Sequence, residues 1–238
     1  MTNTLTIPSG FSGPAGIGNG GYTSGRIAAY LDGPVTVTLR RPPPLDTPMT
    51  VEHDDASSVR LLHDGTLIAE ATRTPDGPGM ELPGTVSLAE ADAAAGSAKY
   101  FADPLYPSCF VCGPNRAPGD GMRIFPGPVG ELWAAPWTPD PSVGDAFGRV
   151  LPEAVWAALD CPTGIAAAEA AQLTESMLLG RITGSVSGLP AVGDRCRVLA
   201  WPAARDGRKL TAGSAVLGPG GEVLAVATAL WLTTGVGA

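Results

Sequence analysis

The strongest constraint on the fold is that the chain repeats one order of predicted elements, a helix followed by antiparallel strands. In the first part, a Gly-rich entry leads into an apolar helical stretch at 22–31, which Asp32-Gly33-Pro34 ends. Alternating apolar residues and hairpin signals then predict strands at 35–39, 49–53, 59–62 and 66–73. In the second part, a strand at 131–137 precedes a long helix at 152–171, followed by strands at 176–187, 194–201, 211–217 and 222–233.

The hairpins that close the two parts also correspond in sequence. Residues 64–72 align with residues 220–228, and each segment begins at a turn. A repeat of about 110 to 130 residues is too long for a solenoid unit, which has roughly 20 to 50. The pattern therefore predicts a duplicated domain, with the Ala-rich segment 89–96 in the linker.

Composition excludes several classes of protein. The chain has 238 residues, of which 44% are hydrophobic and 16% charged, as expected of a globular protein. Its net charge is −8 and its basic residues form no stripe, which argues against nucleic acid or an anionic membrane as partner. We find no signal peptide at residues 1–9 and no apolar run of roughly 18 residues for a membrane helix. We therefore expect a cytoplasmic protein.

The first motif with chemical content is Gly18-Asn19-Gly20-Gly21-Tyr22, at the start of the first helix. A helix N-terminus leaves backbone N–H groups unpaired, with the positive end of the helix dipole behind them. Glycines would let a carbonyl approach closely, so that the N–H of Gly20 or Gly21 could hold an oxyanion. The alternative is that Asn19 is only a helix cap and the glycines serve a tight turn.

The second motif is Asp160, within Val155-Trp156-Ala157-Ala158-Leu159-Asp160 of the second helix. An Asp is almost never fully buried without a partner, and this one lies on a helix that is apolar nearly all round. The alternative is that Asp160 caps a break in the helix at Cys161-Pro162, because a proline disfavours helical geometry at the residue before it.

With these motifs and the repeated order of elements, the chain resembles the hotdog-fold thioesterase superfamily over nearly its whole length. The resemblance implies an α+β fold of two hotdog domains, residues 1–95 and 104–238, each an antiparallel sheet wrapped around a central helix. In the similar dimers the two sheets join edge to edge between subunits, so we expect them to join here within one chain. Further assembly into homo-oligomers stays open.

The resemblance also assigns roles to the two motifs. In the similar proteins an Asn-Gly-Gly or His-Gly-Gly segment comes from one subunit, and an acidic residue in the helix of the other is the base or nucleophile. The catalytic residues implied here are Asn19, Gly20, Gly21 and Asp160. We further expect substrate contacts from Tyr22, Trp156 and Thr163.

The two parts are complementary in these motifs. Two turns after its Gly-Gly, the first part has Ala28 and Ala29 and lacks an acid. Two turns before Asp160, the second part has Pro152 and Glu153 and lacks a Gly-Gly. The sequence therefore predicts one composite site, in which Asn19, Gly20 and Gly21 lie beside Asp160.

The function that the resemblance implies is hydrolysis of an acyl thioester. Asp160 would activate water or attack the thioester, and a helix N-terminus would stabilise the oxyanion. The substrate would be an acyl-CoA or an acyl-carrier thioester, and no cofactor is expected. A non-catalytic acyl-thioester binder is the alternative. Dehydration of a hydroxyacyl thioester is less favoured, because hotdog hydratases use a helix His that this chain lacks.

The remaining motifs give weaker evidence of function. Cys109 and Cys112 form a CxxC, but a structural zinc site needs four ligands, and the remaining Cys and His residues form no second pair at ligand spacing. We therefore predict no metal site, and prefer a buried turn to zinc or a redox pair. The glycines at 16–21 have GxGxxG spacing without the βαβ context of a dinucleotide site. Arg40 and Arg41 either meet CoA phosphates or form a solvated face.

Overall fold

The computed structural model describes residues 3–235. The predicted helices and strands occur in the expected order, and strands at 3–5 and 127–129 and a helix at 88–96 are present in addition. The strands are β1 (Asn3–Leu5), β2 (Val35–Leu39), β3 (Met49–Asp55), β4 (Ser58–His63), β5 (Thr66–Arg73), β6 (Gly127–Val129), β7 (Leu132–Trp137), β8 (Met177–Val186), β9 (Cys196–Asp206), β10 (Lys209–Leu217) and β11 (Val223–Thr233). The α-helices are α1 (Gly20–Ala28), α2 (Leu88–Gly96) and α3 (Pro152–Ala170), and the short 3₁₀ helices are η1 (Ser9–Phe11), η2 (Lys99–Phe101) and η3 (Pro141–Val143). None of the described helices is long and apolar enough to cross a membrane.

All described strands belong to one antiparallel sheet, in the order β1-β3-β4-β5-β2-β8-β11-β10-β9-β7-β6. The first part of the chain contributes β1–β5 and the second contributes β6–β11. The parts meet where β2 pairs with β8, with Val37 opposite Ile182. The Thr36 and Thr183 hydroxyls add a hydrogen bond of 2.8 Å across this seam. The expected joining of the strands edge to edge within one chain is confirmed.

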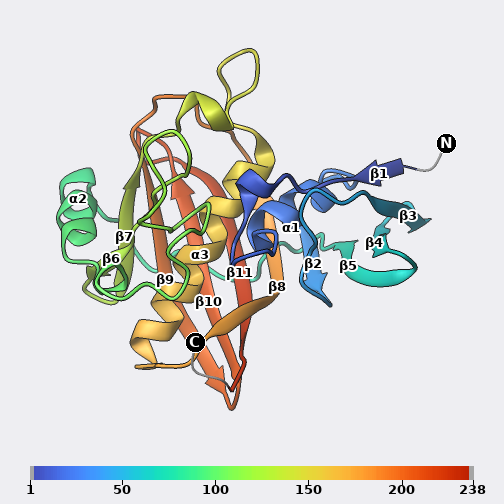
Figure 1. Ribbon diagram of the computed structural model, residues 1–238. Coiled ribbons are helices and arrows are strands. Elements are labelled where there is room, and N and C mark those ends of the chain that lie inside the picture. The colour runs from blue at the N-terminus through green and yellow to red at the C-terminus, as the bar shows by residue number, and fades with distance from the viewer. Residues whose placement is uncertain (1–2, 236–238) are drawn as a thin grey trace.

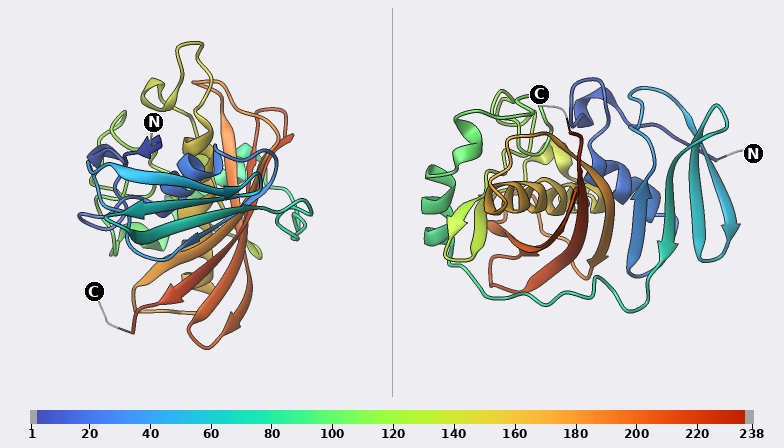
Figure 2. Two further views of the ribbon diagram at one scale, coloured as in Figure 1. Left: turned by 90° about the vertical axis from the view of Figure 1, so that its right-hand side faces the viewer. Right: turned by 90° about the horizontal axis from the view of Figure 1, so that it is seen from below.

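The repeat in the sequence reappears as a repeat in topology. Following α1, the strands are arranged β3-β4-β5-β2, and following α3 they are arranged β9-β10-β11-β8, which is the same order. The second set is longer and curls around α3, as the right-hand view in Figure 2, seen from below, shows. Strand β9 continues to Asp206 instead of ending at Trp201, because it pairs along most of its length with β10.

Helix α3 is continuous, so the alternative of a break at Cys161-Pro162 is wrong. Pro162 lies inside the helix, which continues to Ala170. Two backbone carbonyls near Pro162 accept hydrogen bonds from side chains. The Ser214 hydroxyl donates to Leu159 O at 2.8 Å. The Thr163 hydroxyl likewise donates to Asp160 O at 2.6 Å.

The segment between the two parts contains a helix that the sequence pattern did not predict. Helix α2 begins at a capping box in which Ser87 and Glu90 exchange side-chain and backbone hydrogen bonds. It packs on β6 and β7, on the left in Figure 1, and therefore against the second part of the chain. Ala91 of α2 belongs to a small apolar cluster with Trp201 on the sheet face opposite α3.

Two glycines one turn apart bring α1 and α3 together. A Cβ at Gly21 would lie 2.4 Å from Asp160 Cβ and 2.7 Å from Trp156 O. A Cβ at Gly25 would lie 2.5 Å from Glu153 Cα. The helix backbones are thus in direct contact, and this contact places the start of α1 beside the middle of α3.

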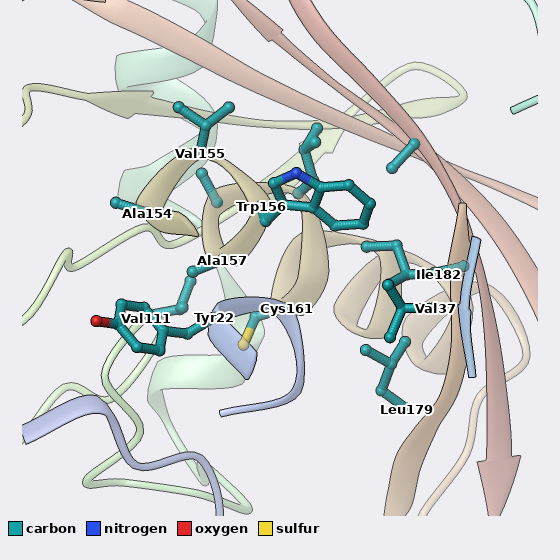
Figure 3. Close-up of a cluster of buried hydrophobic side chains, with 14 of the residues drawn as sticks. Tyr22, Val37, Val111, Ala154, Val155, Trp156, Ala157, Cys161, Leu179 and Ile182 are labelled. Carbon is teal, nitrogen blue, oxygen red and sulfur yellow. The ribbon is translucent and has the colours of Figure 1, made fainter. Parts of the chain in front are cut away.

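The main core is continuous across both parts of the chain. It includes residues of α1, α3 and the strands on either side of the β2–β8 seam. Figure 3 shows Trp156 of α3 directed toward Val37 and Ile182 at this seam. The Trp156 ring also covers Gly184, where an added Cβ would lie 2.7 Å from it. The two parts therefore share one core.

We expect Gly25→Ala to destabilise the protein by about 1–3 kcal/mol, the usual cost of overpacking a core. The new methyl group would meet the backbone of Glu153, which cannot move without shifting α3. Thermal unfolding measures the effect. Gly96→Ala at the end of α2 is the matched control, because a Cβ there meets nothing within 4 Å. Equal melting temperatures for the two variants would contradict the close helix contact.

Candidate active site

Asn19 is the residue directly before α1 and is buried, with 2% of its surface exposed. Its side-chain Oδ1 accepts a hydrogen bond from Tyr22 N at 2.8 Å, which caps the helix. The cap also explains why α1 begins at Gly20, before the first residue of the predicted helix. Since Oδ1 is used for the cap, the Nδ2 amide points away from the helix and is available as a donor.

Asp160 lies beside this cap, although it comes from the other part of the chain. Its Oδ2 accepts from Gly21 N at 2.8 Å and from Asn19 Nδ2 at 3.2 Å. Its Oδ1 is buried and has no hydrogen-bond partner among the described residues. The expected meeting of Asn19 and Gly21 with Asp160 is confirmed. One carboxylate oxygen is held in place and the other is left for a ligand or water.

Burial raises the pKa of Asp160 to about 7, because the charged form loses its hydration. The Gly21 N–H opposes this shift, and the nearby Cys109 adds to it. Both the acid and the carboxylate are therefore populated near neutral pH, which suits a group that must accept and return a proton.

The two glycines of the motif have different roles. The Gly21 N–H is occupied by Asp160, so it is not available to a substrate oxygen. The Gly20 N–H, at the first position of α1, has no acceptor among residues 3–235. Of the two oxyanion donors that the sequence left open, the geometry favours Gly20.

A cavity of about 220 Å³ opens at these residues. Asn19, Gly20 and Asp160 lie in its wall, and apolar side chains form much of the remainder, among them Leu39, Tyr106, Met177, Leu179 and Trp231. Arg40 and Arg41 follow β2 at its edge and are exposed. Arg40 pairs with Glu70, whereas the side chain of Arg41 has no hydrogen-bond partner within the described part of the chain.

The three expected substrate contacts do not line this cavity, and the structure gives each of them a packing role. Tyr22 stacks on Phe11, with ring centroids 3.9 Å apart. Trp156 fills the seam between the two parts, as described above. The Thr163 hydroxyl accepts from Trp231 Nε1 at 2.8 Å. They were predicted to contact substrate because they lie near the motifs in sequence, but their side chains do not point into the cavity.

The pseudo-equivalent second site lacks the same chemistry, as the sequence predicted. Ala28 stands in α1 where Asp160 stands in α3, and Pro152 and Glu153 replace the Gly-Gly. Glu153 pairs with Arg26 instead, with Nε and Oε1 3.7 Å apart. The described residues thus form the composite arrangement once.

The fold brings a third cysteine beside the CxxC, which the spacing of cysteines along the chain did not indicate. The sulfur atoms of Cys109, Cys112 and Cys161 all lie within 4.8 Å of one another. Spacing along the chain could not reveal this, because Cys161 comes from α3 and the CxxC from the loop before β6. The only sequence signal was that Cys161 follows Asp160 directly.

Comparison with known proteins places the fold. No family model and no curated protein matches the sequence. Among solved structures, a tesB protein of Mycobacterium avium subspecies paratuberculosis is similar, with 15% identity, a TM-score of 0.64, and 97% of this chain and 91% of that chain covered. A candidate thioesterase II from Thermobifida fusca has 15% identity and a TM-score of 0.56 over the same shares.

A third similar structure is a hotdog-fold protein of unknown function from Alicyclobacillus acidocaldarius. It has 12% identity and a TM-score of 0.54, with 98% of this chain and 93% of that chain covered. The fold is therefore the α+β hotdog fold. The chain shares it, over nearly its whole length, with proteins named as thioesterases, and the resemblance predicted from sequence is confirmed at the level of the fold.

Proposed function

We propose that the protein hydrolyses an acyl thioester, and that an acyl-CoA is its substrate. The observation that carries this proposal is the buried Asp160 carboxylate. One oxygen is fixed by Gly21 and Asn19, and the other is unpartnered beside a cavity that also contains Gly20. Similar folds named as thioesterases are consistent with this chemistry.

In the proposed reaction, the thioester carbonyl oxygen accepts a hydrogen bond from the Gly20 N–H at the positive end of α1. Asp160 Oδ1 takes a proton from a water molecule, whose oxygen forms a bond to the carbonyl carbon. When the tetrahedral intermediate collapses, the carbon–sulfur bond breaks. The proton held by Asp160 passes to the leaving thiolate, and a carboxylic acid and free thiol result. Direct attack by Oδ1 on the thioester is the variant of this scheme that the sequence left open.

Asn19 acts as a positioning residue in this scheme. It joins the two motifs, because its Oδ1 caps α1 and its Nδ2 holds Asp160. The other donor to Asp160 Oδ2, Gly21 N, is fixed by the helix itself. The carboxylate is therefore oriented by two groups from α1 before any substrate binds, as a general base requires.

The proposed domain organisation is a pair of hotdog domains, residues 1–95 and 104–238. Its support is the repeated strand order around α1 and α3 and the single seam between β2 and β8. Although α2 precedes residue 95 for most of its length, it packs on the second domain. The composite site then lies between the domains, as in the dimers that the chain resembles.

Turnover distinguishes the hydrolase from a non-catalytic acyl-thioester binder. The purified protein is incubated with acyl-CoAs that differ in acyl length and polarity, and free CoA and free acid are separated by chromatography. We expect both products to form in equal amounts from at least one member. If an acyl-CoA binds saturably but no acyl-CoA in the series releases CoA, the result would favour a non-catalytic acyl-thioester binder.

Arg41 is the cation at the cavity edge that is best placed for the CoA phosphates. We expect Arg41→Ala to raise KM about tenfold with little change in kcat, because a charge-assisted hydrogen bond contributes about 1.5–3 kcal/mol. Arg205→Ala, on the exposed end of β9 and outside the cavity wall, is the matched control. An unchanged KM for Arg41→Ala would remove this contact from the proposal.

A further inference from the structure

Three cysteines converge next to the proposed active site. Cys109 Sγ lies 3.6 Å from Cys161 Sγ, and the Cys112 sulfur completes a group whose members are all within 4.8 Å. All three side chains are buried and reduced. A tetrahedral zinc ion with Zn–S bonds of about 2.3 Å sets its sulfurs about 3.8 Å apart. The 3.6 Å between Cys109 and Cys161 is close to this value, and no pair exceeds it by more than about 1 Å.

The loop that carries two of these sulfurs is held firmly. Gly113 N donates to Cys109 O at 2.9 Å, which closes the CxxC turn. A Cβ at Gly113 would lie 2.5 Å from Cys109 N, so only glycine fits there without a shift. Phe110 N donates to Ser12 O at 2.7 Å, and Ile124 N donates to Val111 O at 2.9 Å. The backbone thus fixes both sulfurs before any ion binds.

The third sulfur comes from a different element. Cys161 lies on α3, and Figure 3 shows it on the side of the helix that faces Val111 and Tyr22. A CxxC that served only as a dithiol would need no further cysteine. Three thiols gathered in one buried site are instead the ligand set that thiophilic divalent ions select.

We infer that Cys109, Cys112 and Cys161 bind one thiophilic divalent cation of the Zn²⁺ class. The sulfurs face two entry paths: Cys109 lines the active-site cavity, Cys112 lines a second cavity of about 490 Å³, and Cys161 lines both. The Tyr100 hydroxyl, 3.7 Å from Cys112 Sγ, is not a ligand in this assignment, because its oxygen already accepts a hydrogen bond from Tyr106 N at 3.2 Å. The fourth ligand is then a water or small molecule from a cavity.

A bound ion would affect both the charge and the position of these three side chains. A divalent cation would stabilise the thiolate forms of all three. It would also link the 109–112 loop to α3 through the metal. This link would lie beside the Asn19 amide, whose Nδ2 is 3.9 Å from Cys109 Sγ and 3.8 Å from Cys161 Sγ.

The test is titration of reduced, chelator-treated full-length protein with Co²⁺, followed by competition with Zn²⁺. We expect one equivalent of Co²⁺ to produce thiolate-to-metal charge-transfer absorption, which Zn²⁺ abolishes. Cys112→Ser and Cys161→Ser should lose this absorption. Cys196→Ser is the matched control, because Cys196 is also a buried free thiol but lies at the start of β9, outside the cluster.

A second measurement on the unaltered chain covers the case in which a cluster variant fails to fold. Zn²⁺ should protect three thiols of the native protein from a thiol reagent and raise its melting temperature. Absence of charge-transfer absorption together with no protection would overturn the proposal, and so would a Cys196→Ser variant that behaves like the cluster variants. The proposal would also be overturned if the protein is isolated with a Cys109–Cys112 or Cys109–Cys161 disulfide, and if this disulfide quickly forms again on reoxidation even when Zn²⁺ is present. None of these readouts depends on thioester hydrolysis.

Discussion

Asp160→Asn is expected to lower kcat for acyl-CoA hydrolysis by about 10²–10⁴-fold, the range that a general base contributes. The amide has the shape of the carboxyl group, and its oxygen can still accept from Gly21 N. It cannot take a proton from water at the free position. Because the cavity wall is unchanged, the affinity for a non-hydrolysable acyl-CoA analogue should remain within a few fold. Initial rates and calorimetric titration measure the two effects.

Glu169→Gln is the matched control for this substitution. Glu169 lies on the same helix, and its Oε2 accepts a hydrogen bond from Trp133 Nε1 at 2.7 Å, which a glutamine oxygen can also accept. It does not line the active-site cavity. The hydrolysis rate of Glu169→Gln should stay close to that of the unaltered protein. Full activity of Asp160→Asn would remove the proposed mechanism, whatever the control does.

Gly20→Pro is expected to lower kcat by about 10²–10³-fold, the usual cost of losing one oxyanion donor. Proline at the first position of a helix is well tolerated, since its missing N–H has no partner in the helix. The residue before it must be extended, and Asn19 already has a ψ of 132°. The substitution therefore deletes the proposed donor with little change to the backbone.

Gly20→Ala separates the loss of the N–H from the addition of atoms. A Cβ at Gly20 would lie 3.0 Å from Leu179 Cδ2 and 3.2 Å from Leu39 Cδ1, and both are ends of flexible side chains. We expect Gly20→Ala to retain most of kcat. If the alanine and proline variants lost the same activity, the effect would be steric and the Gly20 N–H would not be the oxyanion donor.

Much of the fold could be predicted because the sequence contains the same order of helix and strands twice. Periodicity placed α1, α3 and most strands, and the retention of Asn19-Gly20-Gly21 in one part and Asp160 in the other predicted their contact. These are local signals: a helix cap, a polar residue in an apolar helix and a hairpin turn. Each reports on its own segment, and the resemblance supplied how the segments meet.

The features that were missed depend on contacts between distant segments. The glycine at position 21 is required by the approach of α3 rather than by the approach of a substrate, and that cannot be seen from the segment alone. The convergence of Cys161 with the CxxC has the same origin. Helix α2 is different, because the Ser87–Glu90 spacing of its capping box was a readable local signal.

The most direct test of the composite site is a crystal structure with a ketone analogue of acyl-CoA, in which a methylene group replaces the thioester sulfur. We expect the carbonyl oxygen to lie about 3 Å from Gly20 N and the carbonyl carbon to face Asp160 Oδ1, directly or through one water. Binding of the analogue outside the cavity, or inside it with the carbonyl directed away from both groups, would contradict the composite site.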